Sequence, residues 1–470
     1  MVVDAMKPHV VVLPSPGMGH VTPMLELAKR LVLHHNCHVT FLHISTQASV
    51  NEIRMLHSSF NHLPPGLNVV DLPPADVSAI ISDDTSVFSH LCIIVRESLR
   101  CLKDTLLDMQ NPQAFITDLF STQTLDICRD LSIHSYILCT TSALFLAFSF
   151  FDCRETQRDV SVEFLHLPGC APLRTEDVPP LLNNGDNEWF SYHICRLPMA
   201  DGIFINTWED LEPVPIRAIR EHPFYKQIHT PLVYSIGPLV KETEPVTQTG
   251  EECLAWLDKQ PAESVLFVAL GSGGHLCAEQ LTELAWGLEL SRKRFLWMVR
   301  TPTKVNTGMK SFFDVGVDVN DPKSYLPKGF MERTKELGMV VPSWVPQMLV
   351  LRHHSTGAFL SHCGWNSVLE SVSHGVPMIT WPLYADQMLN ATMIAEDIGV
   401  AIKPAVEAGR RVIGRKEIER VVRAVMEGEE GKAMRGRAND LKESALKAIN
   451  FGGTSFEALA DVANQWKVLI

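Results

Sequence analysis

Short apolar runs alternate with amphipathic segments along most of this chain, and that alternation limits the possible folds more than any other feature. A first series extends from His9 to Gly237 and a second from Val265 to about Ile402. Strands that alternate with helices along a chain form parallel sheets with helices on both faces. The sequence therefore predicts an α/β protein that contains two doubly wound domains.

The length of the chain and one polar stretch indicate where these domains divide. A chain of 470 residues is too long for one ordinary hydrophobic core. The polar stretch Lys241–Glu251 separates the two series and is expected to be a linker. We therefore predict a first domain over residues 1–240, a linker over 241–251 and a second domain over 252–450.

Two further segments differ in composition from the elements around them. Thr301–Lys328 is too polar for a core and is predicted to form a loop. Residues 451–470 carry apolar side chains at helical spacing and are predicted to form a terminal helix. Thr454 and Glu457 have the spacing of a capping box at the start of that helix.

The first elements of the chain could suggest a dinucleotide-binding fold. His9–Leu13 is predicted to be a buried strand, Pro14–Gly19 a tight loop and Val21–Leu33 an amphipathic helix. Thr22, however, stands where the third glycine of a dinucleotide fingerprint belongs, and no acidic residue ends the next strand, Val39–His43. The sequence therefore disfavours NAD binding.

The same loop places a histidine where a general base could act. His20 lies at the C-terminal end of the first strand, where ligands bind in open α/β sheets, and a neutral imidazole can take a proton from an attacking hydroxyl. Asp118 follows another predicted strand and would emerge at the same edge. A carboxylate there fixes the tautomer and stabilises the imidazolium. Alternatively, both residues could serve only at helix N-termini.

The segment Trp344–Gln387 contains a strand-to-helix turn that could bind an anion. Gly357–Ser361 suits a buried strand, and Trp365–Ser373 has helical spacing. The turn and the first residues of the helix hold His362, Gly364, Asn366 and Ser367. Free backbone N–H groups and the helix dipole favour an anion at such a turn, and a diphosphate would fit.

Other side chains of this segment suit the remaining parts of a nucleotide sugar. Glu370 lies one turn further along the predicted helix, within reach of ribose hydroxyls, and Trp344 offers a flat face to a base. Asp386 and Gln387 follow another apolar run, and an acceptor-only side chain beside a mixed donor and acceptor matches sugar hydroxyls. Taken singly, each tryptophan of the segment would more often be a core residue.

A glycine-rich turn supplies a third candidate. The run Ser264–Gly274 reads SVLFVALGSGG, an apolar strand followed by three glycines and a serine. Glycines let the backbone approach a phosphate closely, and the Ser272 hydroxyl adds a donor. Such a turn is common after strands, so it indicates a phosphate site only together with the other two motifs.

Composition excludes several classes of function. The formal net charge is −13 and no run of Lys or Arg is present, which argues against nucleic-acid binding. No targeting segment precedes the first strand, and the most apolar candidate, Ala143–Phe151, is too short to span a bilayer. The eleven cysteines show no C-x-x-C spacing, so we expect reduced core thiols in a cytoplasmic protein that does not bind membranes.

These motifs together resemble those of the plant family-1 UDP-dependent glycosyltransferases. The resemblance covers essentially the whole chain, and PSPGMGH, GSGG and EGEEGK are most similar to the group acting on hydroquinone, monolignols and chlorophenols. It implies the GT-B fold, in which two Rossmann-like domains face each other across a cleft. The first domain would bind the acceptor and the second the UDP-sugar, and the terminal helix would return to the first.

The resemblance also implies a role for each motif residue. The G-H-x-x-P loop and the Asp after the predicted strand Ala114–Thr117 correspond to a catalytic dyad of His20 and Asp118. Uracil would meet Trp344 and Val345, and ribose would meet Gln347 and Glu370. The phosphates would meet Ser272, His362, Gly364, Asn366 and Ser367, and the sugar would meet Trp365, Asp386 and Gln387. Phe120 and Phe148 are expected to line the acceptor pocket.

The implied reaction is a direct displacement that inverts the anomeric centre of glucose. UDP-glucose would donate glucose to a hydroxyl of a small phenol and yield a β-glucoside. No D-x-D metal motif accompanies the segment, so neither a metal nor a cofactor is expected, and the protein is expected to be a monomer. A UDP-sugar epimerase and a non-catalytic UDP-sugar-binding protein of the same fold are the alternatives, although the second would not need the dyad.

Overall fold

The chain divides into two compact units in the computed structural model. Unit 1 comprises Met1–Lys241 and Ala445–Ile470, and unit 2 comprises Glu242–Ser444. The structure describes residues 7–45, 60, 63–82, 85–109, 112–154, 162–178, 184–242, 244, 246–303, 321–342, 344–407 and 412–468. Residues 304–320 of the predicted loop Thr301–Lys328 therefore lie outside the described residues.

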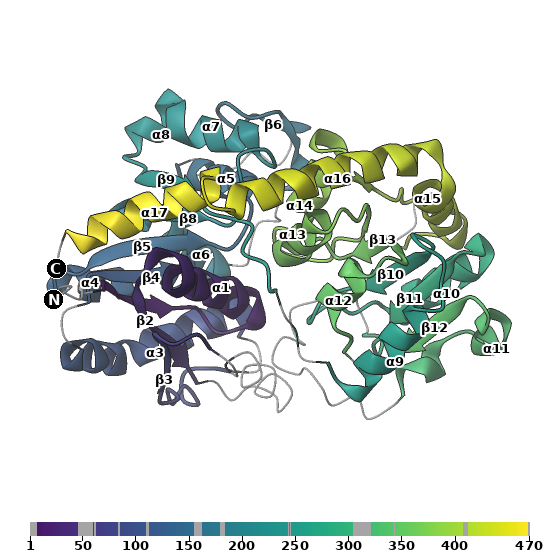
Figure 1. Cartoon of the computed structure of the whole chain (residues 1–470), viewed down its shortest axis with the longest axis horizontal. Coiled ribbons are helices and arrows are strands. Elements are labelled where there is room, and N and C mark those ends of the chain that lie inside the picture. The colour runs from purple at the N-terminus through teal and green to yellow at the C-terminus, as the bar shows by residue number, and fades with distance from the viewer. Residues whose placement is uncertain are drawn as a thin grey trace. The chain divides into compact units, whose positions relative to one another are not determined.

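A seven-stranded parallel sheet forms the centre of unit 1 (Figure 1). Its strands are β1 His9–Leu13, β2 His38–Ile44, β3 Leu67–Leu72, β4 Ala114–Asp118, β5 His134–Cys139, β8 Gly202–Ile205 and β9 Leu232–Ser235. Their order in the sheet is β3-β2-β1-β4-β5-β8-β9. The chain thus builds outward from β1 to one edge and then crosses to β4, so the order reverses between β1 and β4.

Helices cover both faces of this sheet. They are α1 Met18–His35, α3 Val87–Asp108, α4 Thr124–Asp130, α5 Ala143–Arg154, α6 Asn184–Ile194, α7 Pro213–Glu221, α8 Pro223–Gln227 and α17 Thr454–Lys467. The described part of the unit also contains a two-stranded antiparallel ribbon of β6 Phe164–Leu165 and β7 Leu173–Arg174 and the short 3-10 turns Thr175–Asp177 and Leu197–Met199.

The alternation of side chains along β1 explains these two layers. Val10 and Val12 belong to the core that contains α1 and α17, whereas Val11 and Leu13 belong to the core that contains α3 and α4. Successive side chains of a strand point to opposite faces, so a strand that is apolar at every position must be covered on both sides. This apolar run is what requires the doubly wound arrangement.

The terminal helix α17 is part of unit 1, with the N-terminal elements (Figure 1). Trp466 is 0% exposed, and its ring meets that of Tyr136 edge-on at 5.3 Å. The predicted capping box at its start is wrong. The helix begins at Thr454, but Gly453 is its N-cap residue and no side chain caps it, because the extended backbone that precedes the helix is one residue earlier than Thr454.

Unit 2 contains a six-stranded parallel sheet. Its strands are β10 Val265–Ala269, β11 Arg294–Met298, β12 Gly338–Val341, β13 Thr356–Ser361, β14 Met378–Thr380 and β15 Ala401–Ile402. Their order is β12-β11-β10-β13-β14-β15, so the reversal lies between β10 and β13.

The helices of unit 2 pack on this sheet. They are α9 Gln248–Leu257, α10 Ala278–Ser291, α11 Phe330–Thr334, α12 Gln347–Arg352, α13 Trp365–Ser373, α14 Gln387–Thr392 with a π-helical turn at Met393–Asp397, and α15 Arg415–Glu427. A 3-10 turn occupies Pro322–Tyr325, and α16 Glu429–Ile449 passes from unit 2 into unit 1. Helix α9 begins inside the polar stretch that we interpreted as the linker.

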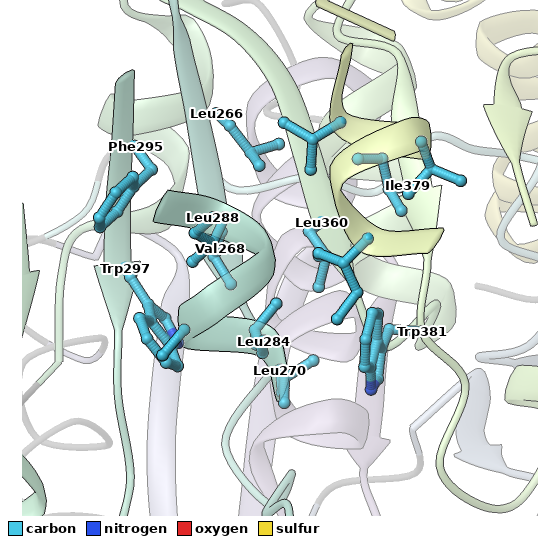
Figure 2. Packing of buried hydrophobic residues seen from close by; sticks show 14 of the residues in the cluster. Leu266, Val268, Leu270, Leu284, Leu288, Phe295, Trp297, Leu360, Ile379 and Trp381 are labelled. Atoms are coloured by element: carbon cyan, nitrogen blue, oxygen red, sulfur yellow. The ribbon is translucent and has the colours of Figure 1, made fainter. Parts of the chain in front are cut away.

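Leucines of α10 fill the core above β10 and its neighbours. Figure 2 shows Leu284 and Leu288 beside Leu266 and Val268 of β10, with the rings of Phe295 and Trp297 of β11 near by. These side chains are no more than 2% exposed. The rigid packing holds the ends of β10, β11 and β13 in register.

The prediction that all cysteines are reduced is wrong for two of them. Cys153 of α5 forms a disulfide with Cys195, which follows α6, and their Cα atoms are 6.5 Å apart. The fold brings together two cysteines that are 42 residues apart in the sequence, and such a pairing leaves no spacing signal in a sequence. The other nine cysteines are not disulfide-bonded, and burial raises the pKa of thiols such as Cys37 and Cys128 to about 12.

Candidate active site

The order reversal in unit 1 brings the ends of β1 and β4 side by side. Ligands of open α/β sheets bind outside the carboxyl ends of the strands at such a reversal. The loop after β1 leads into α1, which begins at Met18 and not at the predicted Val21, so His20 lies in its first turn. Gly17 precedes the helix with φ 110°, a conformation that favours glycine. Asp118 is the last residue of β4.

His20 and Asp118 are in contact, as the sequence predicts for a dyad. Nδ1 of His20 lies 3.1 Å from Oδ2 of Asp118, and the two side chains are 16% and 0% exposed. The hydroxyl of Thr140, in the loop after β5, lies 3.4 Å from the same ring nitrogen. Because Asp118 can only accept when it is ionised, Nδ1 carries the proton and Nε2 is left as the basic nitrogen.

Three further groups hold Asp118 in place. The backbone N–H and the hydroxyl of Ser15 donate to its two oxygens at 2.6 Å each, and the N–H of Phe120 donates at 2.9 Å. Burial alone would raise the pKa of Asp118, but the charge and hydrogen bond of His20 and the hydrogen bonds of Ser15 together lower it below its ordinary value. The buried carboxylate is therefore ionised at neutral pH.

Aromatic rings lie beside the dyad. The ring of Phe120 is 5.4 Å from the His20 ring and is partly exposed, and it meets Phe88 edge-on at 4.8 Å. Phe148 is only 1% exposed and contacts Phe145 of the same helix at 6.2 Å between ring centroids. The structure thus places Phe120 beside His20, and it buries Phe148 next to Phe145 in α5.

The order reversal in unit 2 brings the glycine-rich turn after β10 beside the turn after β13. A Cβ atom on Gly271 would lie 2.5 Å from Cε1 of His362, and one on Gly364 would lie 2.5 Å from its Nε2. Only glycine at both positions leaves room for this imidazole. The turn after β10 and the N-terminus of α13 are therefore packed together through His362.

The neutral ring of His362 lies near the positive charge of Arg300. Burial, and then the charge of Arg300, lowers the pKa of His362 to about 4, so its ring is neutral at neutral pH. Its Nδ1 is buried without a hydrogen-bond partner. Arg300 donates from Nη1 to the backbone oxygen of Ser272. The guanidinium and the N-terminus of α13 make this edge of the sheet attractive to an anion.

Helices α12 and α13 bring three of the predicted residues together. The side-chain amide of Gln347, the first residue of α12, donates to Ser367 Oγ at 2.9 Å and to Glu370 Oε2. Trp344 and Val345 immediately precede α12; Trp344 is partly exposed, whereas Val345 is 1% exposed. The partly exposed indole offers a flat face to a base, and the joined side chains of Gln347 and Glu370 offer polar groups to a ribose.

The start of α14 holds the last predicted pair. Gln387 is 3% exposed, and its Oε1 accepts from the N–H groups of Leu383 and Tyr384 at 2.8 and 3.1 Å. Asp386 accepts from Nδ2 of Asn390 at 3.0 Å, and Asn390 also donates to the oxygen of Cys363 at 3.1 Å. Asn390 therefore links Asp386 to the turn that carries His362.

Comparison with known proteins agrees with this geometry. The sequence model of the family described as "UDP-glucoronosyl and UDP-glucosyl transferase" matches residues 216–435. The hydroquinone glucosyltransferase of Rauvolfia serpentina is 41% identical over 98% of this chain and 98% of its own length. The chain belongs to the UDP-glycosyltransferase family.

Solved structures extend the likeness to the whole fold of this UDP-glycosyltransferase. The crystal structure of TcCGT1 in complex with UDP is 45% identical, with a TM-score of 0.90 over 98% of this chain and 99% of that one. Phytolacca americana UGT2, complexed with UDP-2fluoro-glucose and pterostilbene, is 37% identical, with a TM-score of 0.84 over 98% and 100%. The two parallel-sheet units are those of a GT-B enzyme, as predicted, and its donor is a UDP-sugar.

Among the described residues of the UDP-glycosyltransferase, no group of three or more His, Cys, Asp or Glu side chains could hold a metal ion. Of the helices in the described ranges, none combines the length and apolar character needed to cross a membrane.

Sequence reasoning missed several residues of this UDP-glycosyltransferase site. Ser15 donates twice to Asp118, and Ser121 exchanges a hydrogen bond of 2.7 Å with Ser15. Arg300, two residues after β11, was also missed. The position of Arg300 just beyond an apolar strand was a usable signal, since strand ends gather at one edge. Nothing in the sequence marks Ser15 as a partner of Asp118, because the two are 103 residues apart.

Proposed function

We propose that this UDP-glycosyltransferase moves glucose from UDP-glucose to a hydroxyl of a small phenol, inverts the anomeric centre and releases a β-glucoside and UDP. The contact between His20 and the buried, ionised Asp118 is the observation that carries the proposal. A protein that only bound UDP-sugars would have no need of it. The names of hydroquinone glucosyltransferase and of the pterostilbene complex support a phenol as acceptor.

His20 supplies the base in this proposal. Its Nδ1 proton is held by Asp118, so Nε2 takes the proton of the acceptor hydroxyl while the oxygen forms a bond to the anomeric carbon. The bond from that carbon to the diphosphate breaks, and UDP leaves with the electron pair. A single displacement of this kind turns an α-linked donor into a β-linked product. Asp118 stabilises the imidazolium that results.

Unit 2 would hold the donor along its helix N-termini. We assign uracil to Trp344 and Val345, and ribose to Gln347 and Glu370, whose side chains are already joined by a hydrogen bond. The diphosphate would meet Ser272, His362, Gly364, Asn366 and Ser367. The sugar hydroxyls would meet Trp365, Asp386 and Gln387. Oε1 of Gln387 already accepts from two backbone N–H groups, which fixes the orientation of its amide beside the proposed sugar position.

The leaving group would be stabilised without a metal or a cofactor. Nine residues of α13 direct their dipole toward the turn that holds His362, and Arg300 adds a full positive charge to the facing turn. Such groups stabilise negative charge as it develops on departing UDP. In the same proposal Phe120 and Phe148 belong to the acceptor side, and the protein acts as a cytoplasmic monomer.

The direct test is to incubate the protein with UDP-glucose and hydroquinone and to analyse the products. We expect a phenol that has gained one hexosyl unit, with the proton coupling of a β-anomeric centre in its NMR spectrum, and one UDP for each glucoside. An α-linked product would contradict inversion. Conversion of UDP-glucose to another UDP-hexose without a glucoside would indicate an epimerase, and binding without turnover would indicate a sensor.

A further inference from the structure

All eleven cysteines lie within the described residues, and Cys195 alone among them is exposed. Its disulfide partner Cys153 is partly exposed, whereas six of the nine cysteines outside the disulfide are buried. A thiolate in solution attacks a disulfide at a sulfur that it can reach. The most accessible cysteine of this chain is therefore one half of its Cys153–Cys195 disulfide.

This exposure suits a link that opens and closes better than a permanent one. We propose a cytoplasmic location for this enzyme, and in the cytoplasm glutathione keeps most thiols reduced. Disulfides that do occur there are usually transient and often sense the redox state. Exposed disulfides also exchange with small thiols more readily than protected ones.

Other contacts hold both helices when the link is open. At the start of α5, Glu212 accepts from the N–H groups of Ala143 and Leu144 at 3.0 Å each. Just after α6, the guanidinium of Arg196 donates to the carboxylate of Asp126. Opening the disulfide therefore releases the ends of the two helices from each other while these anchors remain.

The end of α6 adjoins the aromatic side chain beside the dyad. His193 lies two residues before Cys195, and its Nδ1 is 2.8 Å from the hydroxyl of Thr122. The ring of His193 is 6.1 Å from that of Phe120, which in turn is 5.4 Å from the His20 ring. A change at Cys195 therefore acts close to the side chain that we assign to the acceptor.

We propose that the Cys153–Cys195 disulfide is a thiol-exchange site for small thiols of the glutathione class. The thiolate attacks Sγ of Cys195 and forms a mixed disulfide there, while Cys153 leaves as a thiolate and takes up a proton. A second thiolate attacks the small-molecule sulfur of the mixed disulfide and releases Cys195. The two protein sulfurs are then reduced, and two small thiols have been oxidised to one disulfide.

The direct test uses glutathione and no substrate of the enzyme. The protein is incubated at a series of ratios of reduced to oxidised glutathione and alkylated with N-ethylmaleimide, and its cysteine peptides are identified by mass spectrometry. We expect glutathione on Cys195 at intermediate ratios and alkylation of both Cys153 and Cys195 in excess reduced glutathione. A disulfide that persists in excess reduced glutathione, or glutathione found only on other cysteines, would overturn the proposal.

Two single variants identify the sulfur that is attacked. Cys153→Ser should take up one equivalent of oxidised glutathione at Cys195. Cys195→Ser should react at Cys153 at least about 10-fold more slowly, because partial burial hinders the approach. Adding Cys101→Ser to Cys153→Ser, at a partly exposed cysteine of α3, should leave the uptake unchanged. Equal rates in the two single variants would overturn attack at Cys195.

The effect on the acceptor rests on the proposed function and is measured separately. Coupling between two sites typically changes affinity by about 5- to 150-fold. Because both helices keep their other anchors, we expect the KM for hydroquinone to rise about 5-fold after reduction, with kcat and the affinity for UDP unchanged. The double variant Cys153→Ser/Cys195→Ser should show the raised KM with or without glutathione.

An unchanged KM in the reduced parent would overturn the coupling of the disulfide to Phe120. The exchange itself is observed without UDP-glucose or a phenol. A protein that exchanges glutathione at Cys195 but transfers no glucose would therefore contradict the proposed function and leave the thiol-exchange site in place.

Discussion

Asp118 shows how a buried charge can be fixed before any substrate binds. Its carboxylate is 0% exposed, yet Ser15, Phe120 and His20 surround it with donors. The contacts that keep the carboxylate ionised also fix its orientation. In the proposed reaction His20 would meet an acceptor hydroxyl with its tautomer already set, and the dyad would need no rearrangement.

Ser15→Ala should lower kcat while leaving the affinity for UDP unchanged. The substitution removes the 2.6 Å hydrogen bond from Oγ to Asp118 but keeps the one from the backbone N–H. A hydrogen bond to a charged group contributes about 1.5–3 kcal/mol, so we expect a loss of roughly 10- to 100-fold at most. Initial rates and calorimetry with UDP measure the two quantities.

Ser121→Ala is the matched control for that prediction. Ser121 bonds to Ser15 Oγ at 2.7 Å, so its loss reaches Asp118 only through Ser15 and should cost less. A larger loss in Ser121→Ala than in Ser15→Ala, or a parental rate in Ser15→Ala, would show that Asp118 is not held as described.

Some residues of the site can be predicted from sequence and others cannot. His20, Asp118 and His362 follow apolar strands, and parallel strands gather their carboxyl ends at one edge. Ser15 and Thr140 are as close to a strand end, but small polar residues are common in loops and carry no distinguishing pattern. The hydrogen bonds that Gln387 Oε1 accepts from two backbone N–H groups depend on the conformation of the loop before α14.

At the scale of elements, the turn after β10 and helix α13 act as one unit through His362. Gly271→Ala should disrupt it, because φ at this position is +73° and the new Cβ would lie 2.5 Å from the imidazole. Strain of this kind costs roughly 1–3 kcal/mol, so we expect UDP to bind about 10-fold more weakly. Calorimetry with UDP measures the change.

Gly436→Ala provides the control, since nothing lies within 4 Å of its Cβ position in α16. It should bind UDP as the parent does. Unchanged UDP affinity in Gly271→Ala would mean that the glycine-rich turn does not approach the nucleotide.

The N-terminus of α5 depends on a buried carboxylate. Glu212 accepts from the N–H groups of Ala143 and Leu144 at 3.0 Å each, and burial raises its pKa from 4.5 to about 7. Between these values the folded chain holds more protons than the unfolded chain, so Glu212 makes stability fall as the pH rises through this window.

Glu212→Gln does not titrate and should abolish that trend. From pH 4.5 to pH 7 the free energy of unfolding of the variant should rise relative to the parent by roughly 3 kcal/mol, as measured by urea denaturation at each pH. Histidines that titrate in both proteins cancel in this difference. Glu209→Gln, at a partly exposed glutamate paired with Arg220, is the control. A constant difference between Glu212→Gln and the parent would contradict the account of the α5 cap.

Element boundaries show which signals are reliable. The predicted limits of β1 and α13 are confirmed, because β1 is a continuous apolar run between Pro8 and Pro14 and α13 is a periodic run that begins after Gly364. Helix α1 begins three residues before the predicted Val21. Its first turn starts directly after Gly17 and not at the end of the predicted loop. The prediction that Thr454 caps α17 was wrong, because the spacing of a capping box does not show where the extended backbone before a helix ends.

At the scale of the whole molecule, alternation in the sequence predicts parallel sheets but not their strand order. The reversals between β1 and β4 and between β10 and β13 are properties of the fold, and they bring each candidate site together. The disulfide depends on a contact between distant segments and leaves no local pattern in the sequence.

The return of the C-terminus to unit 1 makes a test of stability possible. Trp466→Ala removes a ring that is 0% exposed and packed on Tyr136. Replacing a buried tryptophan by alanine typically costs about 3–5 kcal/mol, so we expect a clear fall in the urea midpoint of unit 1. Phe451→Ala, at a side chain 89% exposed, should change stability by less than about 0.5 kcal/mol. Equal midpoints for the two variants would contradict the packing of α17.

The central claim is that His20 takes the proton of the acceptor hydroxyl, and the rate of His20→Ala tests it most directly. With an ordinary phenol, kcat should fall by about 10²–10⁴, the usual contribution of a positioned general base. UDP-glucose should bind as tightly as in the parent, because in the proposed site the nucleotide is held by unit 2. Across a series of phenols the loss should be smallest for the most acidic, which already ionise near neutral pH. A His20→Ala enzyme that glucosylates an ordinary phenol at the parental rate would contradict the account.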